Sequence, residues 1–278
     1  MRPPRDLAGA LRRRMRGGGW PPYLPANVPV APSGWIVAPP DFVGVGAQKA
    51  GTTWWYALLT SHPSVHAPPG RRKELHYFDR FWDQAFSAVD ATRYHSFFPR
   101  PVGGRAGEWT PRYMVDFWTP ALLHAAAPDA KILVMLRDPF ERFCSGVTHE
   151  LAHRAPHHAI VAELGVEKCA YRQQLGTILT SFEREAVLVL QYERCRLDPR
   201  GEIRRTFEFI GLDDFEPPAA LLDTDPDPDP DEHRGPRYEP GVNVRDAFVA
   251  TLSDDLARLV ADFPEIDPAL WPSCQGLR

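Results

Sequence analysis

Short apolar runs alternate along the chain with segments whose apolar residues recur every three or four positions. Residues 41–46, 131–136 and 186–190 have the length and apolar density of strands buried on both faces. The other segments carry helical stripes: Trp54/Ala57/Leu58, Phe140/Phe143/Cys144/Val147, Ile203/Phe207/Ile210 and Phe248/Leu252/Leu256/Leu259. Buried strands separated by helices indicate a parallel sheet with helices on both faces. We therefore predict an α/β fold, a three-layer sandwich with a central parallel sheet.

The composition indicates one domain and two irregular segments. At 278 residues and 44% hydrophobic, the chain is long enough for a single large core. Residues 1–40 are rich in Pro and Gly and lack periodicity, so we predict a basic N-terminal extension followed by one domain over 41–278. Prolines and like charges over residues 223–241 preclude regular structure and predict a flexible acidic loop.

Charge and cysteine content limit the classes of partner. The net charge of −4 gives no general attraction to nucleic acid, and the Arg-rich tail is either a surface-lying extension or a contact for an anionic partner. That tail lacks the apolar segment of a secretory signal. The four Cys show no C-x-x-C spacing, which suits a reducing compartment and gives no metal signature. We expect a cytoplasmic protein with no nucleic-acid partner and no stable membrane insertion; the sequence gives no indication of oligomeric state.

The turn at residues 44–55 is suited to hold an anion. Gly51, Thr52 and Thr53 open the helix that follows the first strand, and N–H groups at a helix N-terminus favour a phosphate or sulfate. Lys49 adds a positive charge. Only four of the 32 basic residues are Lys, so a general abundance of lysine does not explain the lysine at this turn. In an ATP- or GTP-binding P-loop the Lys follows the last Gly, whereas Lys49 precedes Gly51. This order argues against an ATPase or GTPase; the alternative is an ordinary turn with a surface lysine.

Arg137 stands directly after the strand predicted at 131–136. Because ligands bind beyond the carboxyl ends of parallel strands, Arg137 and Lys49 should share one edge of the sheet. Ser145 lies outside the apolar stripe of the next helix, so Arg137 and Ser145 are suited to hold a second phosphate. The alternative is a surface ion pair between Arg137 and Asp138 beside a solvated Ser145.

Five motifs, in chain order, resemble those of the sulfotransferases that use 3′-phosphoadenosine 5′-phosphosulfate (PAPS). They are VGAQKAGTT at 45–53, LTSHP at 59–63, KELHYFD at 73–79, TPRY at 110–113 and LRDPFERFCS at 136–145. They are most similar to the branch that contains the heparan sulfate N- and 3-O-sulfotransferases. The resemblance implies a P-loop-like sulfotransferase fold and a PAPS-dependent enzyme. The scarcity of Lys beside abundant Arg, Ala, Pro and Gly hints at a bacterial member.

The resemblance also implies the nucleotide contacts. The 5′-phosphosulfate would be held by Gln48, Lys49, Ala50, Gly51, Thr52 and Thr53. Arg137 and Ser145 would hold the 3′-phosphate, and Tyr192 would complete the nucleotide site. The family's late 3′-phosphate loop would be formed by Arg234, Gly235 and Arg237. Trp54 would stack on adenine, although Trp54 also belongs to the apolar stripe of its helix.

The chemistry that the resemblance implies is in-line sulfonyl transfer to a hydroxyl or, as the alternative, to an amine, with adenosine 3′,5′-bisphosphate (PAP) as product. Lys49 would stabilise the leaving phosphate, so we expect no metal. Glu74 matches the general base of the heparan sulfate branch. His76 is its rival, because both residues face the same side of an extended segment. The alternative role of Glu74 is a salt bridge with Arg71, Arg72 or Lys73.

The acceptor side departs from the 3-O-sulfotransferases. Those enzymes carry a second lysine just before their Ser-Pro element, and Trp109 stands at that position. A polyanionic glycan normally meets several basic residues, whereas this region offers the aromatic residues Trp109, Trp118, Phe81 and Trp82. Unless they belong to the core, such rings stack on sugar faces or on aryl and lipid groups. We therefore expect a small-molecule, glycolipid or neutral-sugar acceptor rather than heparan sulfate.

Two other functions fit parts of the sequence. A P-loop nucleotide kinase or hydrolase needs a metal-binding acid after a strand, and Asp138 is the candidate. A non-catalytic PAP-binding protein would keep the loop at 44–55 but lack a base. Binding of PAP distinguishes the kinase from the other two, and sulfonyl transfer then distinguishes the enzyme from the binding protein.

Overall fold

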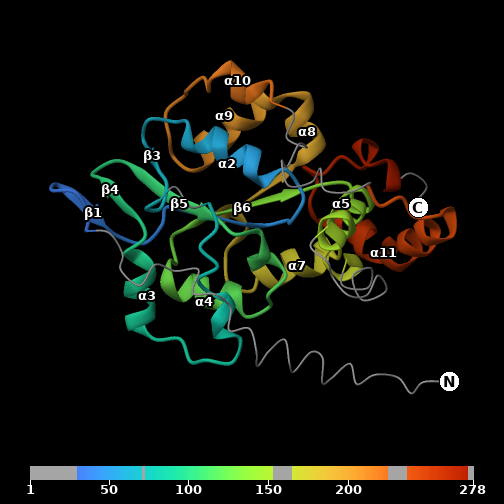
Figure 1. Ribbon diagram of the computed structural model, residues 1–278, viewed down its shortest axis with the longest axis horizontal. Coiled ribbons are helices and arrows are strands. Elements are labelled where there is room, and N and C mark those ends of the chain that lie inside the picture. Colours follow the sequence, from blue (N-terminus) through green and yellow to red (C-terminus); the bar gives the residue numbers. More distant parts are fainter. Residues whose placement is uncertain (1–29, 71–72, 153–164, 225–236, 275–278) are drawn as a thin grey trace.

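The computed structural model describes residues 30–70, 73–152, 165–224 and 237–274. Within these ranges, a five-stranded parallel sheet lies at the centre (Figure 1). In sheet order the strands are β3 (Val65–His66), β5 (Arg105–Trp109), β2 (Phe42–Gly46), β6 (Lys131–Leu136) and β7 (Val187–Gln191). All neighbouring pairs are parallel. The predicted central parallel sheet is confirmed.

Helices cover both faces of the sheet and complete the three-layer sandwich (Figure 1). One layer contains α2 (Thr52–Thr60), α8 (Tyr192–Leu197), α9 (Pro199–Phe209) and α10 (Ala219–Leu222). The other contains α3 (Ala88–His95), α4 (Thr119–Ala126) and α7 (Tyr171–Ile178). At one end, α5 (Pro139–Ala152) lies beside α11 (Val242–Asp262). The 3-10 turns are η1 (Asp79–Trp82), η2 (Pro111–Met114), η3 (Arg184–Ala186), η5 (Pro268–Leu270) and η6 (Pro272–Cys274).

The apolar runs of the sequence form the strands predicted for them. The run at 131–136 is β6, the run at 186–190 is β7 displaced by one residue, and the first run is β2. β2 and β7 are buried throughout, and β6 is buried after its first residue, because helices cover both faces. The four helical stripes belong to α2, α5, α9 and α11. No helix in the described ranges combines the length and apolar character that crossing a membrane requires.

The apolar pattern does not predict β3, β5 or the two-stranded antiparallel sheet that β1 (Trp35–Val37) forms with β4 (Pro99–Pro101). β5 reads Arg-Ala-Gly-Glu-Trp and therefore lacks an apolar run. β1 lies before Asp41, within the segment predicted to be an extension. In the predicted loop at 223–241, residues 225–236 lie outside the described ranges, and residues 237–241 form neither helix nor strand.

Trp109, at the end of β5, packs against β2 through Gly44. A Cβ built on Gly44 would lie 2.0 Å from the indole, so a larger residue at this position would displace the ring. The Trp109 Nε1–H group donates to the carbonyl of Gly46 (3.2 Å), and Trp109 is fully buried. Phe81 is 6% exposed. Both rings belong to the core, so the expectation that they face the acceptor is wrong.

Candidate active site

Two strand-to-helix junctions meet at the carboxyl edge of the sheet. The first joins β2 to α2 and contains Lys49; the second joins β6 to α5 and contains Arg137. They are joined directly, because the Ala47 N–H group donates to Met135 O (2.7 Å) and Arg137 Nη1 donates to Lys49 O (3.3 Å). Lys49 and Arg137 thus share one edge, as the sequence predicts.

The β2–α2 junction presents backbone and hydroxyl donors. Gly51 precedes α2 in the left-handed conformation (φ 79°), and among the described residues no side chain caps α2 and no acid lies in its first turn. A Cβ at Gly51 would also lie 2.7 Å from the Tyr192 ring. Both the left-handed backbone and the close approach of this ring therefore favour glycine at this position. Thr52 is buried and Thr53 is exposed. Such an N-terminus, with N–H groups that no side chain caps, favours an anion.

The remaining loop residues surround this helix start. Gln48 and Lys49 are half-buried, and Ala50 is fully buried. Trp54 is 6% exposed, and its Nε1–H group donates to Leu221 O (2.8 Å). Trp54 therefore packs in the core between α2 and α10, as its place in the apolar stripe indicates. Its contact with adenine stays a prediction.

Asp138 closes the second junction. Its Oδ1 accepts from the N–H groups of Phe140 (2.9 Å) and Glu141 (3.0 Å), and its Oδ2 accepts from the N–H group of Ser273 (2.9 Å). Asp138 is 1% exposed. The carboxylate that a metal-dependent kinase or hydrolase would use at this position is therefore committed to capping α5 and anchoring η6.

Arg137 is a buried cation at the same junction. The residue is 7% exposed, and its guanidinium carbon lies 4.9 Å from the centre of the Tyr192 ring. Ser145 is half-buried on α5. Since Arg137 and Asp138 are both buried, the alternative of a solvated surface pair between them is wrong.

Arg237 approaches this junction from the segment before α11. It pairs with Glu141 of α5, whose carboxylate lies 3.9 Å from Arg137 Nη2. The predicted partners Arg234 and Gly235 lie outside the described residues. Of the three residues proposed for the late phosphate loop, Arg237 is thus the one that the structure places near Arg137.

Lys73 joins the first junction to the acid-bearing segment at 73–79. Its Nζ lies 3.0 Å from the hydroxyl oxygens of both Thr52 and Thr53, and 2.9 Å from Glu74 Oε1. The Trp109 N–H group donates to Lys73 O (2.7 Å), which fixes this segment beside the end of β5. Lys73 is absent from the site residues predicted by sequence; its position directly before Glu74 in the KELHYFD motif was the available signal.

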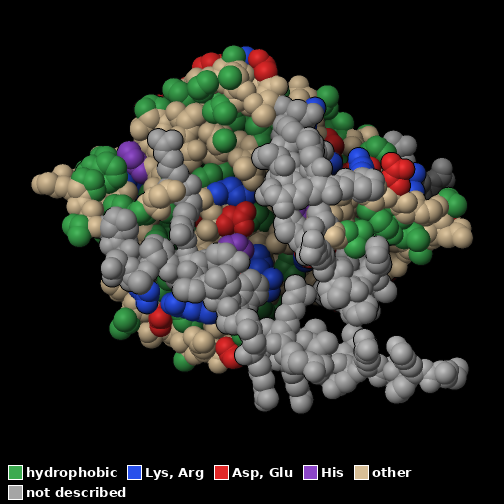
Figure 2. All heavy atoms as spheres, in the orientation of Figure 1, with side chains coloured by type: hydrophobic (Ala, Val, Ile, Leu, Met, Phe, Trp, Pro, Cys, Tyr) green, Lys and Arg blue, Asp and Glu red, His purple; other side chains and the backbone are tan. Residues whose placement is uncertain are grey.

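Glu74, His76 and Asp79 form a hydrogen-bonded row. His76 Nε2 lies 3.0 Å from Glu74 Oε2, and His76 Nδ1 lies 2.9 Å from Asp79 Oδ2. His76 adopts a left-handed backbone (φ 51°), so the extended segment expected from the sequence is wrong, although the two side chains do meet. Glu74 forms both the predicted salt bridge with Lys73 and a hydrogen bond with His76. Figure 2 shows basic, acidic and histidine side chains gathered near the middle of this face.

Neighbouring groups set the charges of His76 and Glu74. Burial alone would lower the pKa of His76, but hydrogen bonds and negative charge from Asp79 and Glu74 raise it to about 9. Burial would raise the pKa of Glu74, but the hydrogen bond from His76 and the charge of Lys73 hold it below its ordinary value. At neutral pH His76 is therefore an imidazolium that donates from both nitrogens, and Glu74 is an ionised proton acceptor.

Side chains of β5 and η2 hold the backbone of this segment. Glu108 and Tyr94 are fully buried, and the Tyr94 hydroxyl donates to Glu108 Oε1 (2.8 Å). The backbone bonds run from Leu75 N–H to Glu108 (2.9 Å) and Thr110 (3.0 Å), from His76 N–H to Thr110 (3.3 Å), and from Tyr77 N–H to the Tyr113 hydroxyl (2.7 Å). The TPRY motif thus positions the segment that carries Glu74.

Known proteins match the chain across this region. The family model described as Sulfotransferase domain matches residues 39–221, which include all five motifs. The chain belongs to the sulfotransferase family. Human heparan sulfate glucosamine 3-O-sulfotransferase 6 is 31% identical over 187 residues, which cover 62% of this chain and 52% of that protein. The chain spans about half the length of the curated relatives it matches.

Solved structures show the same fold for this sulfotransferase. A crystal structure of a sulfotransferase from Alicyclobacillus acidocaldarius matches with a TM-score of 0.63 and 26% identity, covering 84% of this chain and 99% of that one. The mouse sulfotransferase SULT7A1, solved in complex with PAP, matches with a TM-score of 0.51 and 12% identity, covering 82% and 90%. The family and the fold implied by the motifs are confirmed.

The aromatic residues around the acid row of the sulfotransferase separate into two groups. Trp109 and Phe81 belong to the core, as described above. Trp82, at the end of η1, is 53% exposed, and Phe117, after η2, is 77% exposed. Trp118 is half-buried and donates from Nε1 to the carbonyl of Phe78 (3.2 Å). Trp82 and Phe117 therefore present ring surface to solvent near the segment that carries Glu74.

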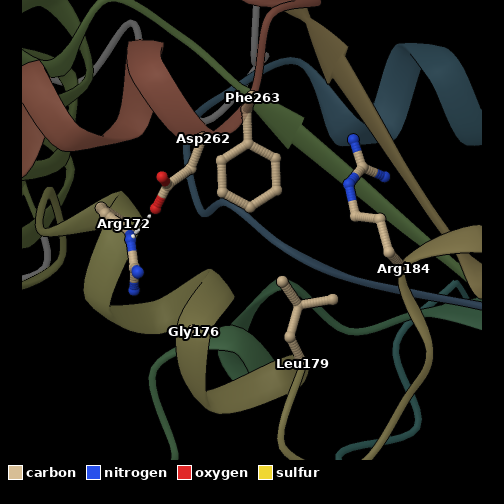
Figure 3. A pocket seen from close by; sticks show the side chains of 6 residues that line it. All are labelled: Arg172, Gly176, Leu179, Arg184, Asp262 and Phe263. Carbon is tan, nitrogen blue, oxygen red and sulfur yellow. Dashed lines mark hydrogen bonds and ion pairs between the residues drawn. The ribbon is translucent and has the colours of Figure 1, made fainter.

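A cavity of about 400 Å³ lies elsewhere in the sulfotransferase (Figure 3). It is lined by Arg172, Gly176, Leu179, Arg184, Asp262 and Phe263. Arg184 lies in η3, which directly precedes β7, so this side of the cavity lies at the amino edge of the sheet, opposite the two junctions. Arg172 pairs with Asp262, and Arg184 pairs with Glu265. Both arginines of the cavity are thus engaged with carboxylates.

Proposed function

We propose that the chain transfers a sulfonyl group from PAPS to a hydroxyl of a sugar, glycolipid or small-molecule acceptor and releases PAP. The observation that carries this proposal is the position of Lys73, whose Nζ lies 3.0 Å from the Thr52 and Thr53 hydroxyls and 2.9 Å from Glu74. An anion cradle and a carboxylate base therefore lie within reach of one ammonium group. Transfer between a bound donor and an adjacent acceptor needs this closeness.

The residues of the two junctions fit the two charged ends of PAPS. The first turn of α2, with Thr52 and Thr53, suits the 5′-phosphosulfate, and Lys49 adds a cation from the loop. Arg137, fixed against Tyr192, and Ser145 on α5 suit the 3′-phosphate. The presence of PAP in the structure of SULT7A1, which shares the fold, supports this assignment.

The proposed transfer is balanced without a further reactant. Glu74 accepts the proton of the acceptor hydroxyl while that oxygen bonds to sulfur. The bond between sulfur and the 5′-phosphate breaks, and its electron pair stays on the phosphate oxygen. Lys49 and the N–H groups of α2 offset the charge that develops there. Glu74 then returns its proton to solvent.

Glu74 is the base in this proposal, and His76 positions it. His76 has both ring nitrogens protonated in contacts with Glu74 and Asp79, so it lacks a lone pair for the acceptor proton. Because the pKa of Glu74 is lowered, we expect turnover to be full at pH 7 and to fall only on acidification. A histidine base would instead give turnover that rises with pH up to its pKa of about 9. The pH profile of turnover distinguishes the two residues.

The acceptor is proposed to carry a sugar or aryl group. The relative named above acts on a sugar, as its name states. In this chain, Trp82 on η1 and Phe117 after η2 offer exposed rings as stacking surfaces. A panel of phenols, sugars, glycolipids and oligosaccharides, incubated with labelled PAPS and read by mass spectrometry, identifies the class and separates O- from N-transfer.

Glu74→Gln tests the mechanism. We expect turnover to fall at least about 100-fold, the scale of a lost general base, while PAP affinity changes less than about threefold. The matched control is Glu185→Gln, which removes the same charge from an exposed position in η3 at the amino edge. Normal turnover in Glu74→Gln contradicts the assignment of the base. Failure of the unaltered protein to bind PAP or PAPS contradicts the proposed function itself.

A further inference from the structure

Lys73 lies at the point where the donor cradle meets the base. Its side chain is 15% exposed, and it is one of only four lysines in the chain. Among the described residues, its ammonium lies within hydrogen-bond distance of oxygens on Thr52, Thr53 and Glu74. Two of these oxygens belong to hydroxyls in the first turn of α2, where we propose that the anion binds, and the third belongs to the proposed base.

We propose that Lys73 is a catalytic residue that binds the sulfonyl oxygens of PAPS during transfer. The proposal rests on the function proposed above. Lys73 Nζ lies 3.0 Å from the hydroxyl oxygens of both Thr52 and Thr53. An anion that accepts hydrogen bonds from these two hydroxyls therefore lies next to the Lys73 ammonium. This position also adjoins Glu74, and the sulfonyl group is the part of the donor that must face the base and the acceptor.

The contact with Glu74 gives Lys73 a second effect. Before PAPS binds, the ammonium pairs with the carboxylate of Glu74 at 2.9 Å. The sulfonyl oxygens compete for the same ammonium, so donor binding loosens its hold on Glu74. Glu74 then accepts the acceptor proton, sulfur bonds to the acceptor oxygen, and the electron pair of the broken bond remains on PAP. Lys73 stays with the sulfonyl group, whereas Lys49 stays with the departing phosphate.

The backbone of Lys73 is held by the end of β5. The N–H group of Trp109 donates to the carbonyl of Lys73 (2.7 Å), so residue 73 is tied to the end of β5. Trp109 is itself locked against Gly44 of β2. The side chain therefore projects from a backbone that the sheet holds, and it reaches α2 across one strand end.

PAP and PAPS differ only in the sulfonyl group, so their binding tests the proposal. Dissociation constants for both are measured by calorimetry for the unaltered protein, Lys73→Met and Lys73→Arg, together with single-turnover transfer. We expect Lys73→Met to weaken PAPS binding at least about tenfold, to leave PAP binding within about threefold, and to slow transfer by about 100-fold or more. Lys73→Arg should restore part of the rate, since it keeps the charge.

The matched control is Lys131→Met, at the amino end of β6, where the ammonium lies 5.2 Å from the Phe209 ring, away from both junctions. It should leave both affinities and the rate unchanged. Equal weakening of PAP and PAPS binding by Lys73→Met would mean that Lys73 only shapes the loop, and it would overturn the proposal. Unchanged PAPS binding and rate would overturn it as well. If the unaltered protein binds PAP but transfers nothing to any acceptor, the proposed function fails first.

Discussion

The two junctions at the carboxyl edge have the same order of strand, turn and helix but treat the helix N-terminus in opposite ways. At α2, Gly51 leaves the first turn without a side-chain cap in the described structure. At α5, Asp138 caps the first turn with its own carboxylate. The positive charge at the second junction is carried instead by Arg137, which is held against Tyr192.

The same order of strand, turn and helix thus offers two different ways to hold an anion. An uncapped N-terminus uses backbone N–H groups, which need a small residue such as Gly51 beside them. A capped N-terminus already has a carboxylate, which repels a further anion, so side chains beyond the cap must do the binding. The following changes test this contrast between the junctions.

Thr53→Asp should have the largest effect, because it gives α2 the carboxylate that α5 already has. We expect PAP affinity to fall at least about 100-fold through repulsion between like charges, while stability stays level or rises by about 0.3–1 kcal/mol. Calorimetric binding and thermal unfolding measure the two effects. Thr53→Asn is the neutral control and should lose much less affinity. A variant that binds PAP normally would show that the anion lies elsewhere.

At the second junction, Asp138→Ala should lower stability but leave PAP affinity largely unchanged. The change removes the cap of α5 and leaves the buried N–H group of Ser273 without its acceptor. We expect the free energy of unfolding to fall by about 2–3 kcal/mol, with PAP affinity changed less than about tenfold when measured well below the melting temperature. Denaturant unfolding gives the first quantity. Lost PAP binding with unchanged stability would place Asp138 in the nucleotide site.

Glu141→Gln should have the smallest effect and should strengthen binding. Glu141 pairs with Arg237 and lies 3.9 Å from Arg137, so its charge competes with a phosphate for both guanidinium groups. We expect PAP to bind about two- to fivefold more tightly at low salt and the gain to shrink as salt rises. Glu150→Gln, on the same helix, is the control. Weaker binding in Glu141→Gln would show that the carboxylate orients the arginines.

The sequence predicts the centre of the fold well and its edge poorly. β6 and β7 are recognised because their residues are apolar and buried on both faces whatever surrounds them. β5 is missed because it lacks an apolar run, and its buried Glu108 accepts hydrogen bonds from Leu75 and Tyr94, which lie 33 and 14 residues away in sequence. Partners far apart in sequence leave no local pattern.

The same reason explains what was missed in the site. The loop at 44–55 and Arg137 follow predictable strands, so their common edge is predictable. Lys73 reaches Thr52 and Thr53 only because β5 lies beside β2, an order that the apolar pattern does not contain. The left-handed backbone of His76 likewise depends on contacts with Thr110 and Asp79. The KELHYFD motif therefore indicates Glu74 and the lysine before it, but not the contact of that lysine with Thr52 and Thr53.

The side-chain bonds that hold Leu75, His76 and Tyr77 have a consequence for local unfolding. A segment without helix or strand usually opens ahead of the core, because few bonds hold its backbone. Here the three N–H groups are bonded to Glu108 of β5, to Thr110 and to Tyr113 of η2, so we expect the segment to unfold in the same cooperative unit as the sheet. Because Lys73 and Glu74 directly precede these bonds, we expect both to be lost together with the sheet and not by local fraying.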